Sequence, residues 1–381
     1  MSGRWVNYGI ATEIESGHIS ASARDTRTPV KPIKTCKTGE LMTEAIGSEL
    51  NPAEAKNEAI RKRYEDILIP IFFSETPTSP DIKLLFSSVL RVTGMEDRGW
   101  DPHAESRAVI DDLYGIMQMQ LPEDRFKDPQ LVTWRVGLMF YSHIIEMSAP
   151  YEVLANLMRY RLGNGYHPNP FFEFLTKDEK KRVKKMGVTT KQKIRIVKEL
   201  SDAAGFQLGT IIDEFYRADF RNAIAHSDFI FTDNGFRCRA SIFDAFSLTF
   251  EQVDDLITSA KLFIGVFFSV EREFRRMWGA QANRALGYDP VYKGMLEILS
   301  NDEGMMEGFK VHWPNGCDSW YRRTNDGIEM TNITLELAQN DLGLFVGNYP
   351  RRPDPFSPVV AFGEKPVYTP HANGTPIVWS V

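Results

Sequence analysis

The residues with the clearest capacity for chemistry lie in one short stretch, from Phe215 to Asp228. Arg221, Asn222 and His226 combine a permanent cation, an amide and a side chain that exchanges a proton near neutral pH. Arginine offers a fixed fork of donors to phosphate oxygens, and histidine serves as a general acid or base. On an ideal helix Arg221 and His226 would point about 140° apart and flank a common groove. The stretch therefore predicts a site for a phosphate group.

The spacing also predicts that these residues end a single helix that begins near Gln207. Steps of three and four residues place six side chains on one helical face: Leu208, Ile212, Phe215, Asp219, Asn222 and His226. The face changes from apolar to polar, and such a change is typical of a functional site. Asp219 and Asp228 are supporting candidates, and a nearby Asp219 would raise the pKa of the imidazole.

The run from Arg221 to His226 resembles the signature of the HEPN superfamily: Arg, a polar residue, three variable residues, then His. The resemblance covers about residues 131–278. It implies a helical bundle and a metal-independent endoribonuclease without a cofactor, of the kind found in toxin–antitoxin, antiviral defence or RNA-processing systems. It also implies Arg221, Asn222 and His226 as catalytic residues, RNA as substrate, and a homodimer whose two motifs face each other. An antitoxin or regulatory protein is an expected further partner. Some antitoxin-paired members carry Tyr two residues after the His, where this chain has Asp228.

Two alternatives use the same residues. A histidine at a helix end is often a cap or a buried hydrogen-bonding residue, so the three side chains could stabilise a purely structural homodimer. The groove could also bind nucleotide or RNA without cleaving it. Exposure separates these hypotheses: an open groove with Arg221 and His226 favours catalysis, whereas a buried and satisfied His226 favours a structural role.

A basic stretch precedes the motif. Residues 177–198 carry ten Lys and Arg residues against Asp178 and Glu179, although the whole chain has a net charge of −6. RNA contact must therefore use a local patch, and solvated helix faces are the alternative. The RNA-binding candidates are Lys181, Arg182, Lys184, Lys185, Lys191, Lys193 and Arg195, with Arg237 and Arg239 from a predicted hairpin.

The surrounding sequence predicts a mainly α protein. Polar residues followed by proline predict four helix starts, at Asn51-Pro52, Ser79-Pro80, Asp101-Pro102 and Asp128-Pro129, and the first of these helices is expected to end at Pro70. Amphipathic periods, including an inward apolar face from Val253 to Trp278, predict a helical domain over residues 51–300. The resemblance implies that this domain is HEPN-like. Asn234-Gly235 predicts a β-hairpin inserted between the helices. Residues 1–50 predict a short extended or β arm, and residues 301–381, where proline becomes frequent, predict a small β-rich C-terminal module.

Several classes of function are disfavoured. The cysteines Cys36, Cys238 and Cys317 are far apart in the chain, which favours free thiols in a reducing cytoplasm over disulfides or a zinc site. No run of about 20 apolar residues predicts a membrane span, and no signal peptide is visible. His143 and Glu146 have di-iron spacing, but such sites need partners on other helices, so packing is the interpretation and no metal is expected.

Overall fold

The computed structural model describes residues 52–73 and 102–346, apart from short gaps within 165–168, 240–243, 281–284, 290–293, 314–317, 325–326, 332 and 339–340. The predicted arm at residues 1–50, the helix expected after Ser79 and the residues beyond 346 lie outside the described part.

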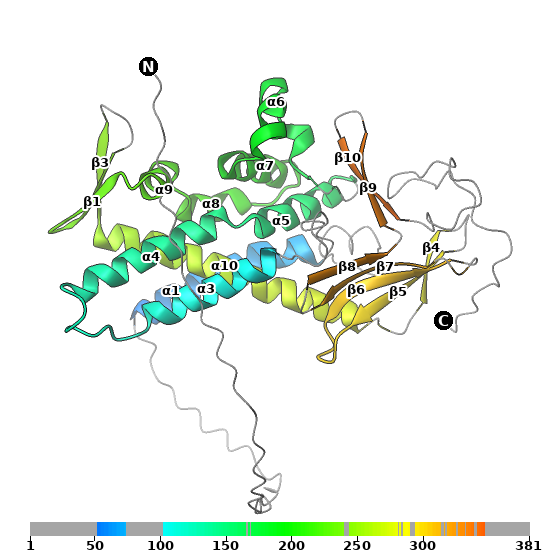
Figure 1. Cartoon of the computed structure of the whole chain (residues 1–381), viewed down its shortest axis with the longest axis horizontal. Coiled ribbons are helices and arrows are strands. Elements are labelled where there is room, and N and C mark those ends of the chain that lie inside the picture. The colour runs from blue at the N-terminus through cyan, green and yellow to red at the C-terminus, as the bar shows by residue number, and fades with distance from the viewer. Residues whose placement is uncertain are drawn as a thin grey trace, which may run out of the picture. The chain divides into compact units, whose positions relative to one another are not determined.

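Helices dominate the described residues up to 279, as the sequence predicts. They are α1 Pro52–Phe72, α3 Pro102–Met117, α4 Pro129–Glu146, α5 Ser148–Arg161, α6 Lys177–Met186, α7 Thr190–Ala203, α8 Leu208–Phe215, α9 Ala218–Ala225 and α10 Phe250–Gly279, with a 3-10 turn, η1, at Phe172–Phe174. Figure 1 shows α1, α3, α4 and α10 running alongside one another. None of these helices combines the length and the hydropathy that crossing a bilayer requires.

The 30-residue helix α10 packs against α1, α4 and α8. Its start is fixed by a capping box, in which Thr249 accepts a hydrogen bond from the Gln252 N–H and the Gln252 side chain accepts one from the Thr249 N–H. The face predicted to point inward is buried throughout: Val253, Ile257, Ala260, Ile264, Phe267, Val270, Phe274 and Trp278. This face is therefore core.

The ends of α1 and α4 show how local chemistry sets helix boundaries. Asp128 caps α4 by accepting the Leu131 N–H at 2.9 Å, as its position before proline predicts. Helix α1 was expected to end at Pro70, but it continues to Phe72. Arg161 donates to the carbonyls of Pro70 and Ile71 at 2.9 and 3.0 Å, which satisfies groups at the C-terminal end of this helix.

The predicted hairpin is present and carries a third strand. Strands β1 Phe229–Thr232, β2 Gly235–Arg239 and β3 Ala245–Thr249 form an antiparallel sheet in that order. Phe236 joins this sheet to the helices, because its ring contacts aromatic rings from α4, α9, β1 and the start of α10: Trp134, Phe220, Phe229, Phe231 and Phe250. The sheet is thus packed on the core.

A second β region follows α10 and begins earlier than residue 301, where the module was predicted to start. One antiparallel sheet orders β4 Ala285–Asp289, β5 Gly294–Ser300, β6 Met306–His312, β7 Ser319–Thr324 and β8 Gly327–Thr331, and a separate pair joins β9 Ile333–Ala338 to β10 Asp341–Val346. Arg275 of α10 donates to the Met306 carbonyl at 2.8 Å. Strand propensity in residues 285–300 was missed because apolar residues there also fit a helical period.

Candidate functional site

The motif residues lie on α9, a helix separate from α8. Tyr216 and Arg217 between the two helices adopt extended backbone angles, with φ/ψ of −91°/109° and −121°/104°. The prediction of one continuous helix from Gln207 to His226 is therefore wrong, and the six-residue stripe is not a single helical face. Its apolar half is buried in α8, whereas its polar half lies on α9.

A tyrosine from α4 satisfies the backbone at this break. The Tyr141 hydroxyl donates to the Phe215 carbonyl at 2.8 Å and lies 3.5 Å from the Arg217 N–H as an acceptor. Both groups would otherwise lose partners where the helix is interrupted. Tyr141 is fully buried, and burial raises the pKa of its hydroxyl far above the usual value. It thus remains a neutral hydroxyl that can donate and accept at once.

The three motif side chains take different environments on α9. Arg221 is half-buried, whereas Asn222 and His226 are exposed. Arg221 Nη1 donates to Asn222 Oδ1 at 2.9 Å, so these neighbours act as a pair. The His226 N–H donates to the Asn222 carbonyl at 3.0 Å and ends the helix. Among the described residues, no hydrogen bond reaches the imidazole, which leaves both ring nitrogens open to solvent or ligand.

Arg221 also contacts a residue that the sequence did not associate with the site. Its Nε lies 2.5 Å from Oε1 of Glu146, the last residue of α4. The second carboxylate oxygen of Glu146 accepts the Thr190 hydroxyl at 2.7 Å. The sequence interpretation assigned Glu146 to packing. No local signal points to this contact, since the two residues are 75 positions apart.

A lysine lies beside this carboxylate without being paired to it. The ammonium of Lys193 donates to the Ser148 hydroxyl and lies 6.0 Å from the centroid of the Phe171 ring. Burial lowers the pKa of Lys193, and the negative charges of Glu152 and Glu146 oppose that shift. Lys193 was predicted to bind RNA, and the structure places it half-buried beside Ser148 and Phe171.

Asp219 forms its ion pair with Arg217, not with the motif residue Arg221. Its carboxylate binds Arg217, with Oδ1 at 2.9 Å from Nε, and accepts the Phe220 N–H at 2.8 Å. Partial burial opposes ionisation, but these hydrogen bonds outweigh it and hold the pKa of Asp219 below the usual range. Seven residues of helix, about 10 Å along the axis, separate Asp219 from His226. Asp219 therefore does not lie close to the imidazole of the same chain, which its predicted supporting role would require.

The turn after His226 adopts a Schellman motif with serine at the left-handed position. Ser227 has φ of 57°, the Ser227 N–H donates to Ile224, and the Asp228 N–H donates to Ala223 at 2.8 Å. Asp228 then fixes the hairpin: its carboxylate binds Arg239 at 2.5 Å, and its carbonyl accepts the Arg239 N–H. Asp228 and Arg239 are thus paired with each other. Arg237 is exposed.

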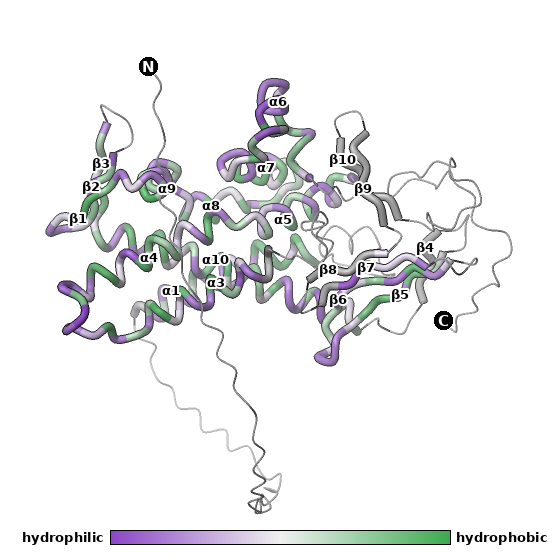
Figure 2. Tube along the Cα trace, viewed as in Figure 1, coloured by the Kyte–Doolittle hydropathy of each residue, from purple (hydrophilic) through white to green (hydrophobic). Residues whose placement is uncertain are grey.

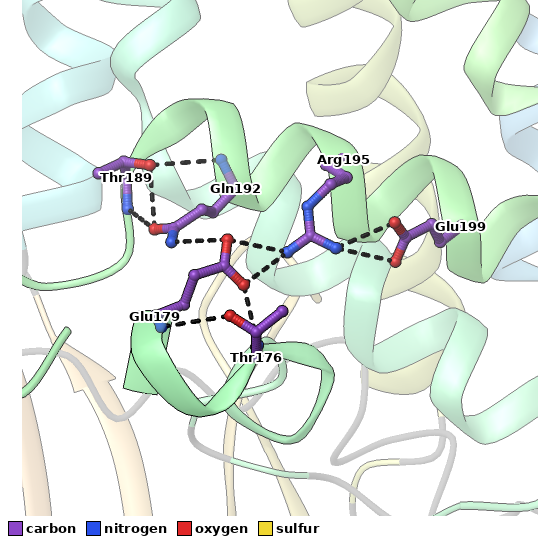
Figure 3. Close-up of polar contacts among 6 residues, drawn as sticks. All are labelled: Thr176, Glu179, Thr189, Gln192, Arg195 and Glu199. Carbon is purple, nitrogen blue, oxygen red and sulfur yellow. Dashed lines mark hydrogen bonds and ion pairs between the residues drawn. The ribbon is translucent and has the colours of Figure 1, made fainter. Parts of the chain in front are cut away.

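The basic stretch folds into α6 and α7, and residues of their N-terminal capping boxes hydrogen-bond to each other. Each helix starts with a capping box, Thr176 with Glu179 and Thr189 with Gln192. Glu179 joins the two, since it accepts the Gln192 amide at 3.1 Å and lies 3.2 Å from the Arg195 guanidinium (Figure 3). Arg195 also binds Glu199 at 3.0 Å, so this candidate cation is already neutralised.

The remaining cations of this stretch divide into paired and open groups. Lys198 binds Asp213 at 2.6 Å, and Lys181 lies 3.6 Å from Asp178. Figure 2 shows α6 mainly in the hydrophilic colour. A pocket of about 430 Å³ opens between the helices and is lined by Arg182, Lys191 and Arg195 together with Glu179, Val183 and Met186. Lys185 is exposed, and the Lys184 side chain lies outside the described part.

Within the residues that the structure describes, no three His, Cys, Asp or Glu side chains are grouped to hold a metal ion. Comparisons of the chain with models of protein families, with curated proteins and with solved structures found no match.

Proposed function

We propose that this protein is an endoribonuclease that cleaves RNA without a metal ion, through Arg221, Asn222 and His226. The observation that carries the proposal is the position of His226. Its imidazole is exposed and without a described hydrogen-bond partner, one turn after the paired side chains of Arg221 and Asn222. RNA cleavage of this kind needs a cation that binds the phosphate and an accessible acid or base. Arg221 and His226 would supply these two groups from one short helix.

In the proposed reaction the ribose 2′-hydroxyl attacks the adjacent phosphorus. A general base removes the hydroxyl proton, the bond from phosphorus to the 5′-oxygen breaks, and a general acid protonates that oxygen. The products are a 2′,3′-cyclic phosphate and a 5′-hydroxyl. Arg221 would stabilise the charge on the phosphoryl oxygens, and Asn222 would orient Arg221 through the hydrogen bond described above.

The reaction needs one neutral and one protonated group at the same time, and a single His226 supplies only one of them. We infer a homodimer in which two copies of α9 face each other and the two imidazoles act as base and acid. The open pocket with Arg182 and Lys191 would receive the RNA backbone on its way to the site. An antitoxin-like or regulatory protein is the proposed partner of such an activity.

The test is cleavage of a defined single-stranded RNA in EDTA by wild type, Arg221→Lys and His226→Ala. Arg276→Ala serves as the control, because Arg276 is an exposed arginine paired with Glu273 on α10. We expect loss of cleavage by about a hundred-fold or more in the two motif variants, with an unchanged control and unchanged dimer mass. Equal cleavage by all four proteins would refute the assignment.

A second function is supported by the ion pair between Arg221 and Glu146. An arginine held by a carboxylate fits a module that binds RNA or nucleotide without cleaving it, or a structural dimer. RNA binding that persists without cleavage, and that is unchanged in His226→Ala, would favour the binding module. Loss of the dimer in Arg221→Lys without any RNA binding would favour the structural role.

A further inference from the structure

A second pocket lies between α3, α4 and α10, on residues that the proposed RNA site does not use. It encloses about 250 Å³ and has an apolar floor formed by the buried side chains of Ile110, Phe140 and Ile264. Its walls carry the aromatic rings of Tyr114 and Phe268. A concave site with an apolar floor and few polar groups has the general character of a small-molecule site.

Two reciprocal cation–π contacts cross this pocket. Arg107 of α3 lies over the ring of Phe268 on α10 at 4.7 Å, and Lys261 of α10 lies over the ring of Tyr114 on α3 at 4.1 Å. Each helix therefore contributes one cation and one ring. Because seven residues separate Lys261 from Phe268, the two contacts are about 10 Å apart along α10.

The charges on the pocket wall are unbalanced. Three cations, Arg107, Lys261 and Arg272, line it with one carboxylate, Asp111. In the part of the chain that the structure describes, no carboxylate lies within ion-pairing distance of these cations. Arg272 lies one turn beyond Phe268, so it belongs to the same end of the pocket as Arg107 and Ser269. This end offers two guanidinium groups and a hydroxyl, a donor set that suits phosphate.

Glycine in the middle of α10 keeps the centre of the pocket open. Gly265 lies between the two cation–π contacts, and a Cβ added there would meet nothing within 4 Å. Glycine weakens a helix interior relative to other residues. A side chain at this position would take up pocket volume, so glycine leaves that volume free for a ligand.

We propose that this pocket binds a small phosphate monoester with a flat apolar body. The phosphate lies at the end formed by Arg107, Ser269 and Arg272, and the apolar body lies over Gly265 against Phe140. The proposal does not depend on the ribonuclease assignment.

The test is a calorimetric titration of the full chain with 1-naphthyl phosphate, compared with 1-naphthol and with inorganic phosphate. We expect saturable binding of 1-naphthyl phosphate and at least about ten-fold weaker binding of the two fragments. Gly265→Leu fills the pocket and Arg272→Gln removes one phosphate donor, so each variant loses about ten-fold in affinity. Gly115→Leu is the matched control: Gly115 is also a helical glycine with nothing within 4 Å of an added Cβ, and it is not a lining residue.

Three outcomes would overturn the proposal. They are no saturable binding of 1-naphthyl phosphate at millimolar concentration, binding that survives unchanged in both pocket variants, and binding lost equally in Gly115→Leu. Gly265→Leu tests shape and Arg272→Gln tests charge, so a folding defect in one variant leaves the other informative. RNA cleavage should be unaffected in both variants, which separates this site from the motif on α9.

Discussion

Arg221 and Glu146 are 75 residues apart in the chain, yet Nε of the arginine lies 2.5 Å from Oε1 of the glutamate. The pair joins the C-terminal end of α4 to the middle of α9. It fixes the direction of the guanidinium and at the same time neutralises it. A phosphate that binds Arg221 must share it with this carboxylate or displace it.

Replacing Glu146 by Gln should strengthen RNA binding. The amide oxygen of Gln still accepts from Arg221, its NH2 group donates to the Thr190 hydroxyl, and the competing charge is removed. Because partly exposed ion pairs contribute about 0.2–1 kcal/mol, we expect about 1.4- to 5-fold tighter binding. Fluorescence anisotropy with labelled single-stranded RNA measures this. Glu273→Gln, at the exposed ion pair with Arg276 on α10, is the control, and equal effects of the two changes would contradict a specific role for Arg221.

The open cations beside α6 and α7 should govern the salt dependence of RNA binding. Lys185→Gln with Lys191→Gln removes two exposed charges, so the slope of log affinity against log salt should fall by about 0.7 for each lost phosphate contact. Arg195→Gln should change the slope less, since Arg195 is already bound to Glu179 and Glu199. An unchanged slope in the double variant would place RNA elsewhere.

Tyr141→Phe should destabilise the protein and disturb the motif. The change leaves the Phe215 carbonyl without its 2.8 Å bond in a buried site, which costs about 1–3 kcal/mol. Urea unfolding measures this loss. Tyr151→Phe, which removes a longer bond of 3.3 Å to the Ile145 carbonyl, should cost less. If α9 depends on this hydroxyl, RNA cleavage should also fall in Tyr141→Phe and be retained in Tyr151→Phe.

Ser227→Gly should stabilise the protein by about 1 kcal/mol. Ser227 has φ of 57°, a conformation that costs residues with a Cβ about 1–2 kcal/mol and that glycine adopts freely. Ser227→Ala keeps the penalty and serves as the control in thermal unfolding. A loss of stability in Ser227→Gly would mean that the serine side chain has a stabilising contact. Reduced cleavage in a more stable glycine variant would mean that the strained turn positions His226.

Acid should separate α6 from α7 before it unfolds the bundle. The Thr176 N–H, followed by the Gln192 side chain, holds the pKa of Glu179 below its usual value. The stability from this carboxylate is therefore present above its unfolded pKa of about 4.3 and is lost as the pH falls through the lower folded pKa. Amide exchange in α6, followed from about pH 6 to about pH 3, should accelerate in wild type. Glu179→Gln should already exchange fast at neutral pH, and Asp178→Asn should resemble wild type.

Local signals in the sequence predicted much of this fold. Three such signals each predicted an element that the structure contains. They are Asp128 before a proline, Asn234 before Gly235, and the apolar period of residues 253–278. The start of the second β region was missed, because alternation in residues 294–300 is short and apolar enough to fit a helix as well.

The assignment of the candidate site residues stays a prediction, and their contacts could not be predicted from the sequence. The spacing of Arg221 and His226 is visible in the sequence, whereas the helix break before them is not. That break depends on the hydroxyl of Tyr141, which is 74 residues away from the carbonyl it binds. The partner of Arg221 on α4 is equally distant in the chain. A single sequence does not indicate which residues far apart in the chain contact each other.

The aromatic contacts of Phe236 limit how the hairpin beside the motif can move. Its ring lies 5.7 Å from Trp134 on α4 and 5.4 Å from Phe250 at the start of α10, and it is fully buried. If strands β1 and β2 moved away from α9, the Phe236 ring would have to leave the core each time. Strands β1 and β2 are therefore held rigidly beside His226, and the amides that pair these two strands should exchange with solvent as slowly as those of α4. Movement of this hairpin therefore does not control access to the imidazole.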